Sequence, residues 1–469
     1  MDEQGFERAS GVIGIDHDDY LLDFTVPPGL MPDRQFDGLP AQLNVHRVRP
    51  LYANDQSPSV PIAVLIHGRT VTGPVVFDLR DPPGVTAPGG GALNLSVQKA
   101  LAWQGIDTFV PSLLGYGKST RFEKGLDDPG NASLRPHDPP NSSRCPYLEG
   151  CDRTLIEAIN PYDQQKDMLF VYPLAEQRRA HSSKIRFART DVWVRDIKQV
   201  IDDAIDRNKD DYGEGRDQVA LVGYSVGGQR VGRALSARNP VVRDELIEKV
   251  SHVVFLNSLF GGPTEEPDPF MPPTFPLTLN DRQKPPGSAS DNLWLMSSPP
   301  EDCPGRIIEG IKDQVWKDTM EHETVGREWG GDDPDRPPTG LNRSPTFSGY
   351  GWNPEVAGEM RTSTPTLVMQ GLKDGTLPTG PFAGQAGPNT GKAIFDALPQ
   401  SMTNKVLVQV ECASHVLQWE GASSWPGPHS IFKQALIEWI KEGRFNRVPR
   451  GGFIVDKRGD VKRDPAIPS

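Results

Sequence analysis

Short, predominantly apolar runs limit the possible folds of this chain more than any other feature. They occupy residues 62–66, 106–110, 218–222, 252–256, 366–369 and 405–410. A run with so few polar residues suits a strand that is covered on both sides, as strands are in a parallel sheet. Helical patterns separate the runs, at residues 95–104, 191–208 (with Thr190 as the expected N-cap), 227–237 and 430–441. This alternation predicts an α/β fold with a mostly parallel sheet flanked by helices.

Two proline-rich stretches interrupt the alternation. Residues 122–189 and 263–362 hold 23 of the 46 prolines. Both also contain aromatic residues and helical pieces that could pack, such as residues 305–320. We therefore interpret both stretches as insertions. Residues 1–262 and 363–469 would form the core, with 122–189 as an excursion from it and 263–362 as a separate inserted segment. Residues 43–48, which alternate between apolar and polar, predict one antiparallel strand at the start of the core.

Charge and cysteine content restrict the partners and the location. The chain has 62 acidic and 50 basic residues, a net charge of −12, so we expect no nucleic acid or anionic membrane surface as a partner. No apolar stretch approaches the ~18 residues of a membrane-spanning helix, and no signal peptide is visible, so we expect a cytoplasmic protein. The four cysteines lack zinc-site spacing. Cys145 and Cys151 would either form a small disulfide loop or, as favoured in the cytoplasm, remain free thiols.

Residues 223–227 (GYSVG) carry the first chemical signal. The pattern G-x-S-x-G is weak alone, but here a predicted strand enters it and a predicted helix leaves it. Such a corner holds Ser225 in a strained backbone conformation with its hydroxyl pointing outward. Glycine is needed at 223 and 227 because a Cβ there would collide with the neighbouring strand or helix. Ser225 is the expected nucleophile; the alternative is an ordinary glycine-rich turn with an incidental serine.

A serine nucleophile needs a base, and the base needs an acid to orient it. His415 follows the last predicted strand of the sheet, so its loop should lie at the same sheet edge as Ser225. His429, at the start of the closing helix, fits a cap or surface position better. Asp374 follows the preceding strand and is the expected acid, whereas the strand before that one ends in Asn257 and a serine, neither of which is a carboxylate.

The oxyanion of a tetrahedral intermediate needs preorganised N–H donors. The backbone N–H of Val226, the first residue after the nucleophile, is one candidate. The backbone N–H of Arg69 is the second, because Gly68 lets the loop after residues 62–66 approach the substrate. Tyr224, beside the nucleophile, would point either into the pocket, where it would bind substrate, or into the sheet.

These motifs together resemble the α/β-hydrolase family. The order Ser225, Asp374, His415 is that of the family, and residues 105–119 are similar to its fourth-strand segment, although Ser112 stands where members usually carry Asp. The resemblance covers residues 43–121, 190–262 and 363–445. It implies that residues 263–362 form a cap over the site and that 122–189 follow the fourth strand.

The resemblance and the triad together indicate a serine hydrolase acting on a small-molecule carboxylic ester or lactone, with no metal or cofactor. Aromatic residues in the insertions would line a pocket for an apolar or aromatic substrate, or else form the small core of the cap itself: Trp294, Trp316, Trp329, Trp352, Phe270, Phe275, Tyr147, Phe170 and Tyr172. An acyltransferase, a carbon–carbon bond hydrolase and a peptidase use the same catalytic residues and stay open. A non-catalytic binding protein on the same scaffold is the alternative outside enzymes.

Overall fold

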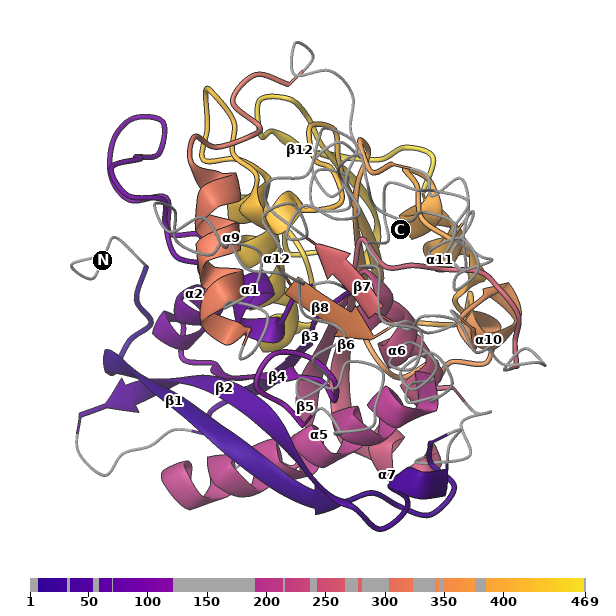
Figure 1. Ribbon diagram of the computed structural model, residues 1–469. Helices are drawn as coiled ribbons and strands as arrows, with labels where there is room; N and C mark the ends of the chain where they lie inside the picture. Colours follow the sequence, from indigo (N-terminus) through magenta and orange to yellow (C-terminus); the bar gives the residue numbers. More distant parts are fainter. Residues whose placement is uncertain are drawn as a thin grey trace, which may run out of the picture.

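A ten-stranded mixed sheet forms the centre of the molecule (Figure 1). The computed structural model describes residues 7–31, 34–53, 59–69, 71–120, 190–213, 216–236, 243–265, 277–280, 303–323, 342–345, 350–375 and 385–467. The strands of this sheet are β1 (Val12–Thr25), β2 (Pro40–Tyr52), β3 (Ile62–Ile66), β4 (Asp107–Ser112), β5 (Val219–Tyr224), β6 (Val250–Leu256), β9 (Thr366–Gly371), β10 (Lys405–Val410), β11 (Arg450–Val455) and β12 (Val461–Arg463).

The strand order is β1-β2-β4-β3-β5-β6-β9-β10-β11-β12. From β4 to β11 every neighbouring pair is parallel. The β1–β2, β2–β4 and β11–β12 pairs are antiparallel, so the antiparallel strands lie at the two edges. The chain has the α/β-hydrolase fold, as the sequence predicted.

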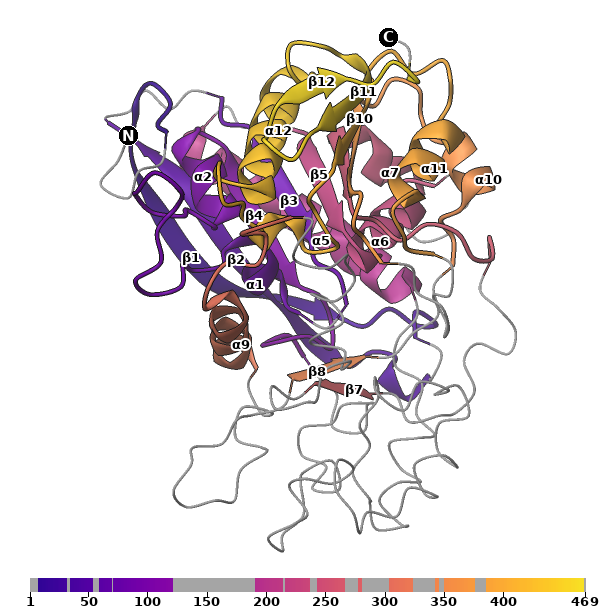
Figure 2. The ribbon, with the colours of Figure 1, turned by 90° about the horizontal axis from the view of Figure 1, so that it is seen from above.

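Helices cover both faces of the sheet (Figure 2). Successive strand residues alternate between two apolar clusters, so that Val64 belongs to one and Leu65 to the other. The cluster with Val64 contains residues of α5 (Thr190–Tyr212), α6 (Val226–Ala234), α7 (Arg243–Glu248), α10 (Pro354–Gly358) and α11 (Thr390–Ala397). The cluster with Leu65 contains residues of α1 (Gly73–Phe77), α2 (Val97–Trp103), α9 (Ile311–His322) and α12 (Pro428–Glu442). Two short 3₁₀ helices, η1 (Arg34–Phe36) and η6 (Leu417–Trp419), complete the described elements of these layers.

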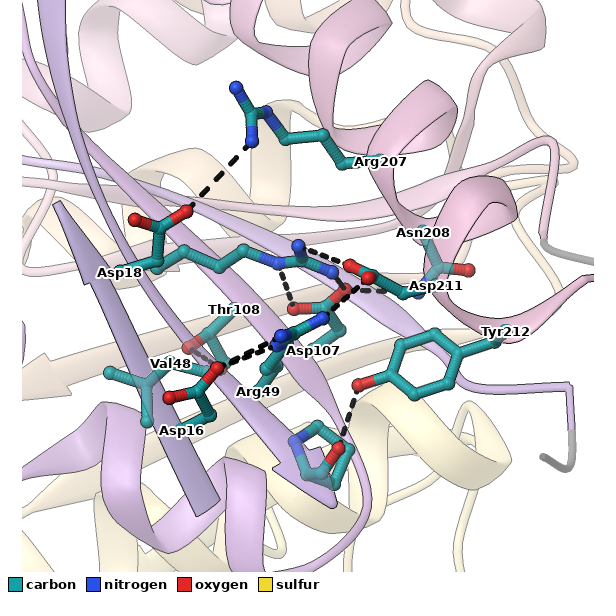
Figure 3. Close-up of polar contacts among 12 residues, drawn as sticks. Asp16, Asp18, Val48, Arg49, Asp107, Thr108, Arg207, Asn208, Asp211 and Tyr212 are labelled. Atoms are coloured by element: carbon teal, nitrogen blue, oxygen red, sulfur yellow. Dashed lines mark hydrogen bonds and ion pairs between the residues drawn. The ribbon is translucent and has the colours of Figure 1, made fainter. Parts of the chain in front are cut away.

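A charged network fastens the antiparallel edge to α5 (Figure 3). The buried guanidinium of Arg47 on β2 binds Asp107 of β4, with Nη2 at 2.6 Å from Oδ2, and Asp211 of α5. Arg49, two residues along β2, binds Asp211 and also Asp16 of β1. Burial raises the pKa of Asp107, although its ion pair with Arg47 opposes the shift. The network joins β1, β2 and β4 to α5. It lies away from the carboxyl ends of the parallel strands, so its role is structural.

Part of the predicted insertion 263–362 packs into the main core. Trp352 is fully buried, and its ring stacks on that of Phe255 on β6 at 4.9 Å. A Cβ on Gly232 of α6 would lie only 2.1 Å from the Trp352 indole, so this helix position requires glycine. Trp352 therefore belongs neither to a substrate pocket nor to a separate cap core.

Another described part of the insertion forms a small sheet of its own. Strands β7 (Leu277–Asn280) and β8 (Asn342–Pro345) form an antiparallel pair of their own, on the side of the molecule that holds α9 (Figure 2). The helical piece predicted at 305–320 is α9, which begins later, at Ile311. Residues 122–189, and with them Cys145, Cys151, Tyr147, Phe170 and Tyr172, lie outside the described residues, as do Trp294, Trp329, Phe270 and Phe275.

Two further observations concern the cysteines and the possibility of a membrane-spanning helix. A disulfide links Cys303, ahead of α9, to Cys412, just after β10. Sequence analysis did not predict this bond, which joins two cysteines 109 residues apart in the chain. Among the described residues, no helix combines the length and apolar character needed to cross a membrane.

Candidate active site

Ser225 lies at the corner between β5 and α6. Its backbone has φ 55° and ψ −123°, a conformation that L-residues other than glycine rarely adopt. Strand β5 ends at Tyr224 and α6 begins at Val226, so the corner consists of Ser225 alone. This is the strained strand–turn–helix geometry that the sequence predicts for residues 223–227.

The glycines around Ser225 are there because no side chain fits. A Cβ on Gly223 would lie 2.6 Å from the Cα of Gly228 in α6. A Cβ on Gly227 would lie 2.4 Å from the carbonyl oxygen of Ile66 at the end of β3. The helix, the nucleophile strand and its neighbour are therefore in backbone contact, and the strain at Ser225 is held by tight packing.

His415 and Asp374 meet Ser225 at the carboxyl edge of the sheet. Nε2 of His415 is 2.8 Å from Oγ of Ser225, and Nδ1 is 3.0 and 3.1 Å from the two carboxylate oxygens of Asp374. All three side chains are buried, with 4–6% of each residue exposed. They follow β5, β9 and β10, which run parallel, so their loops emerge at one edge. The structure brings together the three residues chosen from the sequence.

Asn257 holds the loops of the acid and the base together. Its side-chain Nδ2 donates hydrogen bonds to the backbone oxygens of Ser414 (2.9 Å) and His415 (2.8 Å). Its Oδ1 accepts from the backbone N–H of Gly371, at the end of β9 (2.8 Å). Asn257 itself has φ 41°, in the left-handed region that asparagine tolerates better than most residues. Sequence reasoning considered this strand end only for a carboxylate and missed its bridging amide.

Glu420 anchors the residue before His415. Its fully buried carboxylate accepts hydrogen bonds from the backbone N–H (2.7 Å) and the hydroxyl (2.6 Å) of Ser414. It also forms a buried ion pair with Arg306, from the inserted segment. Burial raises the pKa of Glu420, while the charge of Arg306 and the two bonds from Ser414 oppose that rise. Sequence reasoning missed this pair, since Arg306 and Glu420 are far apart along the chain.

The acid has one further polar partner. Nε2 of Gln370, the penultimate residue of β9, donates to Oδ2 of Asp374 at 2.7 Å. Together with the N–H of His415, this bond accounts for both carboxylate oxygens of Asp374. These bonds hold the carboxylate of Asp374 against the imidazole of His415.

The loop after β3 lies directly beside the nucleophile. A Cβ on Gly68 would be 2.8 Å from Cβ and 3.3 Å from Oγ of Ser225. His67 shapes this loop: its Nδ1–H donates to the backbone oxygen of Gly68 (2.7 Å), and its Nε2 accepts from the N–H of Leu113 (3.0 Å). Burial and the charge of Arg230 lower the pKa of His67 to about 3, which keeps the ring neutral. The loop that carries Arg69 is thus held against Ser225 by a neutral imidazole.

Val226 opens α6, so its backbone N–H has no helix carbonyl one turn earlier to bind. Tyr224 is only 1% exposed, and its ring lies 5.4 Å from that of His415. Contact between Tyr224 and a substrate therefore stays a prediction. His429 is neither the cap nor the surface residue expected from the sequence, since the N-cap residue of α12 is Gly427. It is 1% exposed at the start of α12, with its ring nitrogens near the backbone oxygens of Glu420 and Leu93.

The comparisons with known proteins give only distant matches. No family model and no curated protein matches the chain. One similar solved structure is a thermophilic esterase from Thermogutta terrifontis, with 11% identity and a TM-score of 0.41 over 90% of this chain and 98% of that chain. A second is an esterase from a Rhodococcus species, with 13% identity and a TM-score of 0.40 over 90% of this chain and 98% of that chain. A third is a serine hydrolase from Cycloclasticus zankles, with 12% identity and a TM-score of 0.39 over 92% of this chain and 100% of that chain. Likeness at this level does not bear on substrate, so function is argued from the site.

Proposed function

We propose that this protein is a serine hydrolase that cleaves a small carboxylic ester or lactone through an acyl-enzyme intermediate. One observation carries the proposal: a continuous hydrogen-bonded path runs from Oγ of Ser225 through both nitrogens of His415 to the carboxylate of Asp374. Nucleophile, base and orienting acid are the three roles that acyl transfer by serine needs.

In the first half of the proposed reaction, Oγ of Ser225 attacks the carbonyl carbon while its proton passes to Nε2 of His415. The carbonyl oxygen gains the negative charge and is stabilised by the backbone N–H groups of Val226 and Arg69. Asp374 accepts the Nδ1–H bond and so stabilises the imidazolium that forms. His415 then gives the proton to the leaving alkoxide, and the acyl group stays on Ser225.

In the second half, water replaces the alcohol. His415 takes a proton from the water as it attacks the acyl carbon, and the same oxyanion donors stabilise the second tetrahedral intermediate. Collapse of that intermediate breaks the bond to Oγ, and His415 returns the proton to Ser225. The products are a carboxylic acid and an alcohol, or one hydroxy acid from a lactone. No step needs a metal or cofactor.

The inserted segment 263–362 is proposed to form a cap beside the site. Support comes from its described part: Arg306 pairs with Glu420, and Cys303 is bonded to Cys412, both within a few residues of His415. Its tryptophan and phenylalanine side chains are the reason to expect an apolar or aromatic substrate. Of its described aromatic side chains, Trp316 is half-buried on α9 and is the candidate to test for substrate contact.

A panel of p-nitrophenyl esters of graded acyl length, together with several lactones, tests the proposal. We expect hydrolysis of at least one of them, and losses in kcat of about 10⁴–10⁶-fold for Ser225→Ala and His415→Ala. Stable folding of both variants, measured by circular dichroism, is the control. Hydrolysis that survives Ser225→Ala would overturn the assignment.

Adding an alcohol acceptor to the same assay separates a hydrolase from an acyltransferase. A hydrolase releases mainly the free acid, whereas an acyltransferase forms a new ester at low alcohol concentration. Peptide and carbon–carbon substrates with the same acyl group test the remaining alternatives. Failure of every substrate, with no covalent labelling of Ser225, would favour a binding protein on this scaffold.

A further inference from the structure

A second polar cluster lies at the edge of the sheet formed by β1 and β2, and it is separate from the triad. It consists of His17 on β1, His46 on β2 and Asp78, the C-cap residue of α1. Each residue offers one potential ligand atom, a ring nitrogen or a carboxylate oxygen, and the three atoms all lie within 4.8 Å of one another. Figure 1 shows where the elements that carry them, β1, β2 and α1, lie.

Strand register puts the two histidines on the same face. In the antiparallel β1–β2 pair, His46 stands directly opposite Asp19. His17 is two residues before Asp19, so its side chain leaves β1 on the same side. The ring centroids of His17 and His46 are 5.9 Å apart, the spacing of a diagonal cross-strand pair. This placement depends only on the pairing of two long strands.

Two members of the cluster, the buried His46 and the partly buried Asp78, are already oriented. Nδ1 of His46 is 2.9 Å from Oδ1 of Asp19, which directs the other nitrogen, Nε2, to within 3.0 Å of Oδ2 of Asp78. The second carboxylate oxygen of Asp78 accepts a hydrogen bond from the hydroxyl of Ser96. A histidine that ligates a metal usually donates its other N–H to a carboxylate in this way, and ligating carboxylates are hydrogen-bonded in turn.

We propose that His17, His46 and Asp78 bind a divalent transition-metal ion, with Zn²⁺ as the best match and water as the fourth ligand. Two imidazoles and one carboxylate are a donor set that Zn²⁺ accepts. Ligands about 2.0–2.2 Å from a tetrahedral ion lie roughly 3.3 Å from one another. Nε2 of His46 and Oδ2 of Asp78 are already near that separation.

His17 needs the one adjustment. Its Nδ1 is 4.0 Å from Oδ2 of Asp78, and its side chain is 40% exposed, so a small rotation can bring it within range. The same exposure gives an ion a path from solvent. Two arrangements compete with metal binding: a proton shared between His46 and Asp78, and the ion pair of Lys118 with Asp19 (3.9 Å). An ion bound here would fasten β1 and β2 to the end of α1, a structural role separate from the proposed hydrolysis.

Zinc titration of the full-length protein, purified without a polyhistidine tag and stripped with EDTA, tests the proposal. We expect one equivalent of Zn²⁺ to bind against a competing chelator, and Tm to rise with the logarithm of free Zn²⁺ above Kd. Co²⁺ in place of Zn²⁺ should give the visible absorption of a four-coordinate site.

His17→Ala is the decisive variant because the side chain is half exposed and its removal spares the fold. We expect its Tm in EDTA to equal that of the wild type, its zinc affinity to fall at least ~10-fold, and its Co²⁺ spectrum to be lost. His252→Ala, on β6 and outside the cluster, is the matched control and should bind as the wild type does. Absence of 1:1 binding by the wild type, or equal affinity in His17→Ala, would overturn the proposal.

Discussion

Cys303 is covalently bonded to Cys412, which lies three residues before His415. The bond therefore ties the inserted segment to the loop that carries the proposed base. The ion pair of Arg306 with Glu420 lies beside it and joins the same two parts of the chain. The position of His415 thus depends on residues from outside the sheet as well as on the sheet.

Removing this disulfide should reduce both stability and activity. The two cysteines are 109 residues apart in the chain, and a disulfide typically contributes about 2–4 kcal/mol to the free energy of unfolding, with the larger values for longer loops. We expect the double variant Cys303→Ser/Cys412→Ser to show that loss in urea denaturation, and a lower kcat because the His415 loop loses an anchor. The wild type in dithiothreitol should approach the variant. A variant with unchanged kcat and unchanged stability would contradict the role given to the bond.

Asn257→Ala should impair the chemical step more than substrate binding. The amide bridges the loops of Asp374 and His415, so its loss lets the base move relative to Ser225. A displacement of this kind lowers kcat by about 10–100-fold with little change in KM. Asn404→Ala is a matched control, because it removes an amide bond to the carbonyl of Gly443, outside the triad and its loops. Equal kcat in the two variants would show that Asn257 does not position the base.

Gly68→Ala should abolish most activity without unfolding the protein. The added Cβ would lie 2.8 Å from Cβ of Ser225, so the loop with the Arg69 N–H must move away from the nucleophile. Loss of one oxyanion donor costs about 10²–10³-fold in kcat. Gly358→Ala is the control, because the nearest atom to its Cβ is 3.7 Å away. Full activity in Gly68→Ala would rule this loop out as part of the oxyanion hole.

His429 should matter for stability and not for catalysis. Burial and the charge of Lys433 lower its pKa to about 3, against 6.5 in the unfolded chain. The unfolded state therefore binds the extra proton as pH falls from 6.5 towards 3, and folding stability falls with it. His429→Gln should flatten the dependence of unfolding free energy on pH in this window, by up to about 1.4 kcal/mol per pH unit.

Two outcomes would contradict this account of His429. Loss of kcat in folded His429→Gln would make it the base in place of His415. An unchanged pH slope would mean that the native ring keeps its second proton between the oxygens of Glu420 and Leu93.

The parallel strands were predicted best, because strands buried on both faces are predominantly apolar along their length. Residues 62–66 and 405–410 are β3 and β10 to the residue. Strand β1 was missed since polar residues stand on both of its faces, Asp16 and Asp18 on the half-buried face and His17 and Asp19 on the exposed one, and hide the strand pattern. Only part of the antiparallel β2 was predicted for the same reason, as its polar positions include the ion-pairing Arg47 and Arg49.

The triad could be chosen from sequence because each member follows a recognisable strand. The residues that support it could not, because Asn257, Glu420 and Arg306 act through backbone groups and partners that are distant in the chain. The Cys303–Cys412 bond was hidden in the same way. Disulfides are typical of oxidising compartments, so this bond counts against the cytoplasmic location, which stays a prediction.

Covalent labelling with a fluorophosphonate tests the central claim most directly. We expect one adduct per chain, mapped by mass spectrometry to Ser225, with loss of esterase activity in proportion to labelling. Labelling should vanish in Ser225→Ala and become far slower in His415→Ala, since the base activates the hydroxyl. An unlabelled wild-type protein, or an adduct at another serine, would contradict the account.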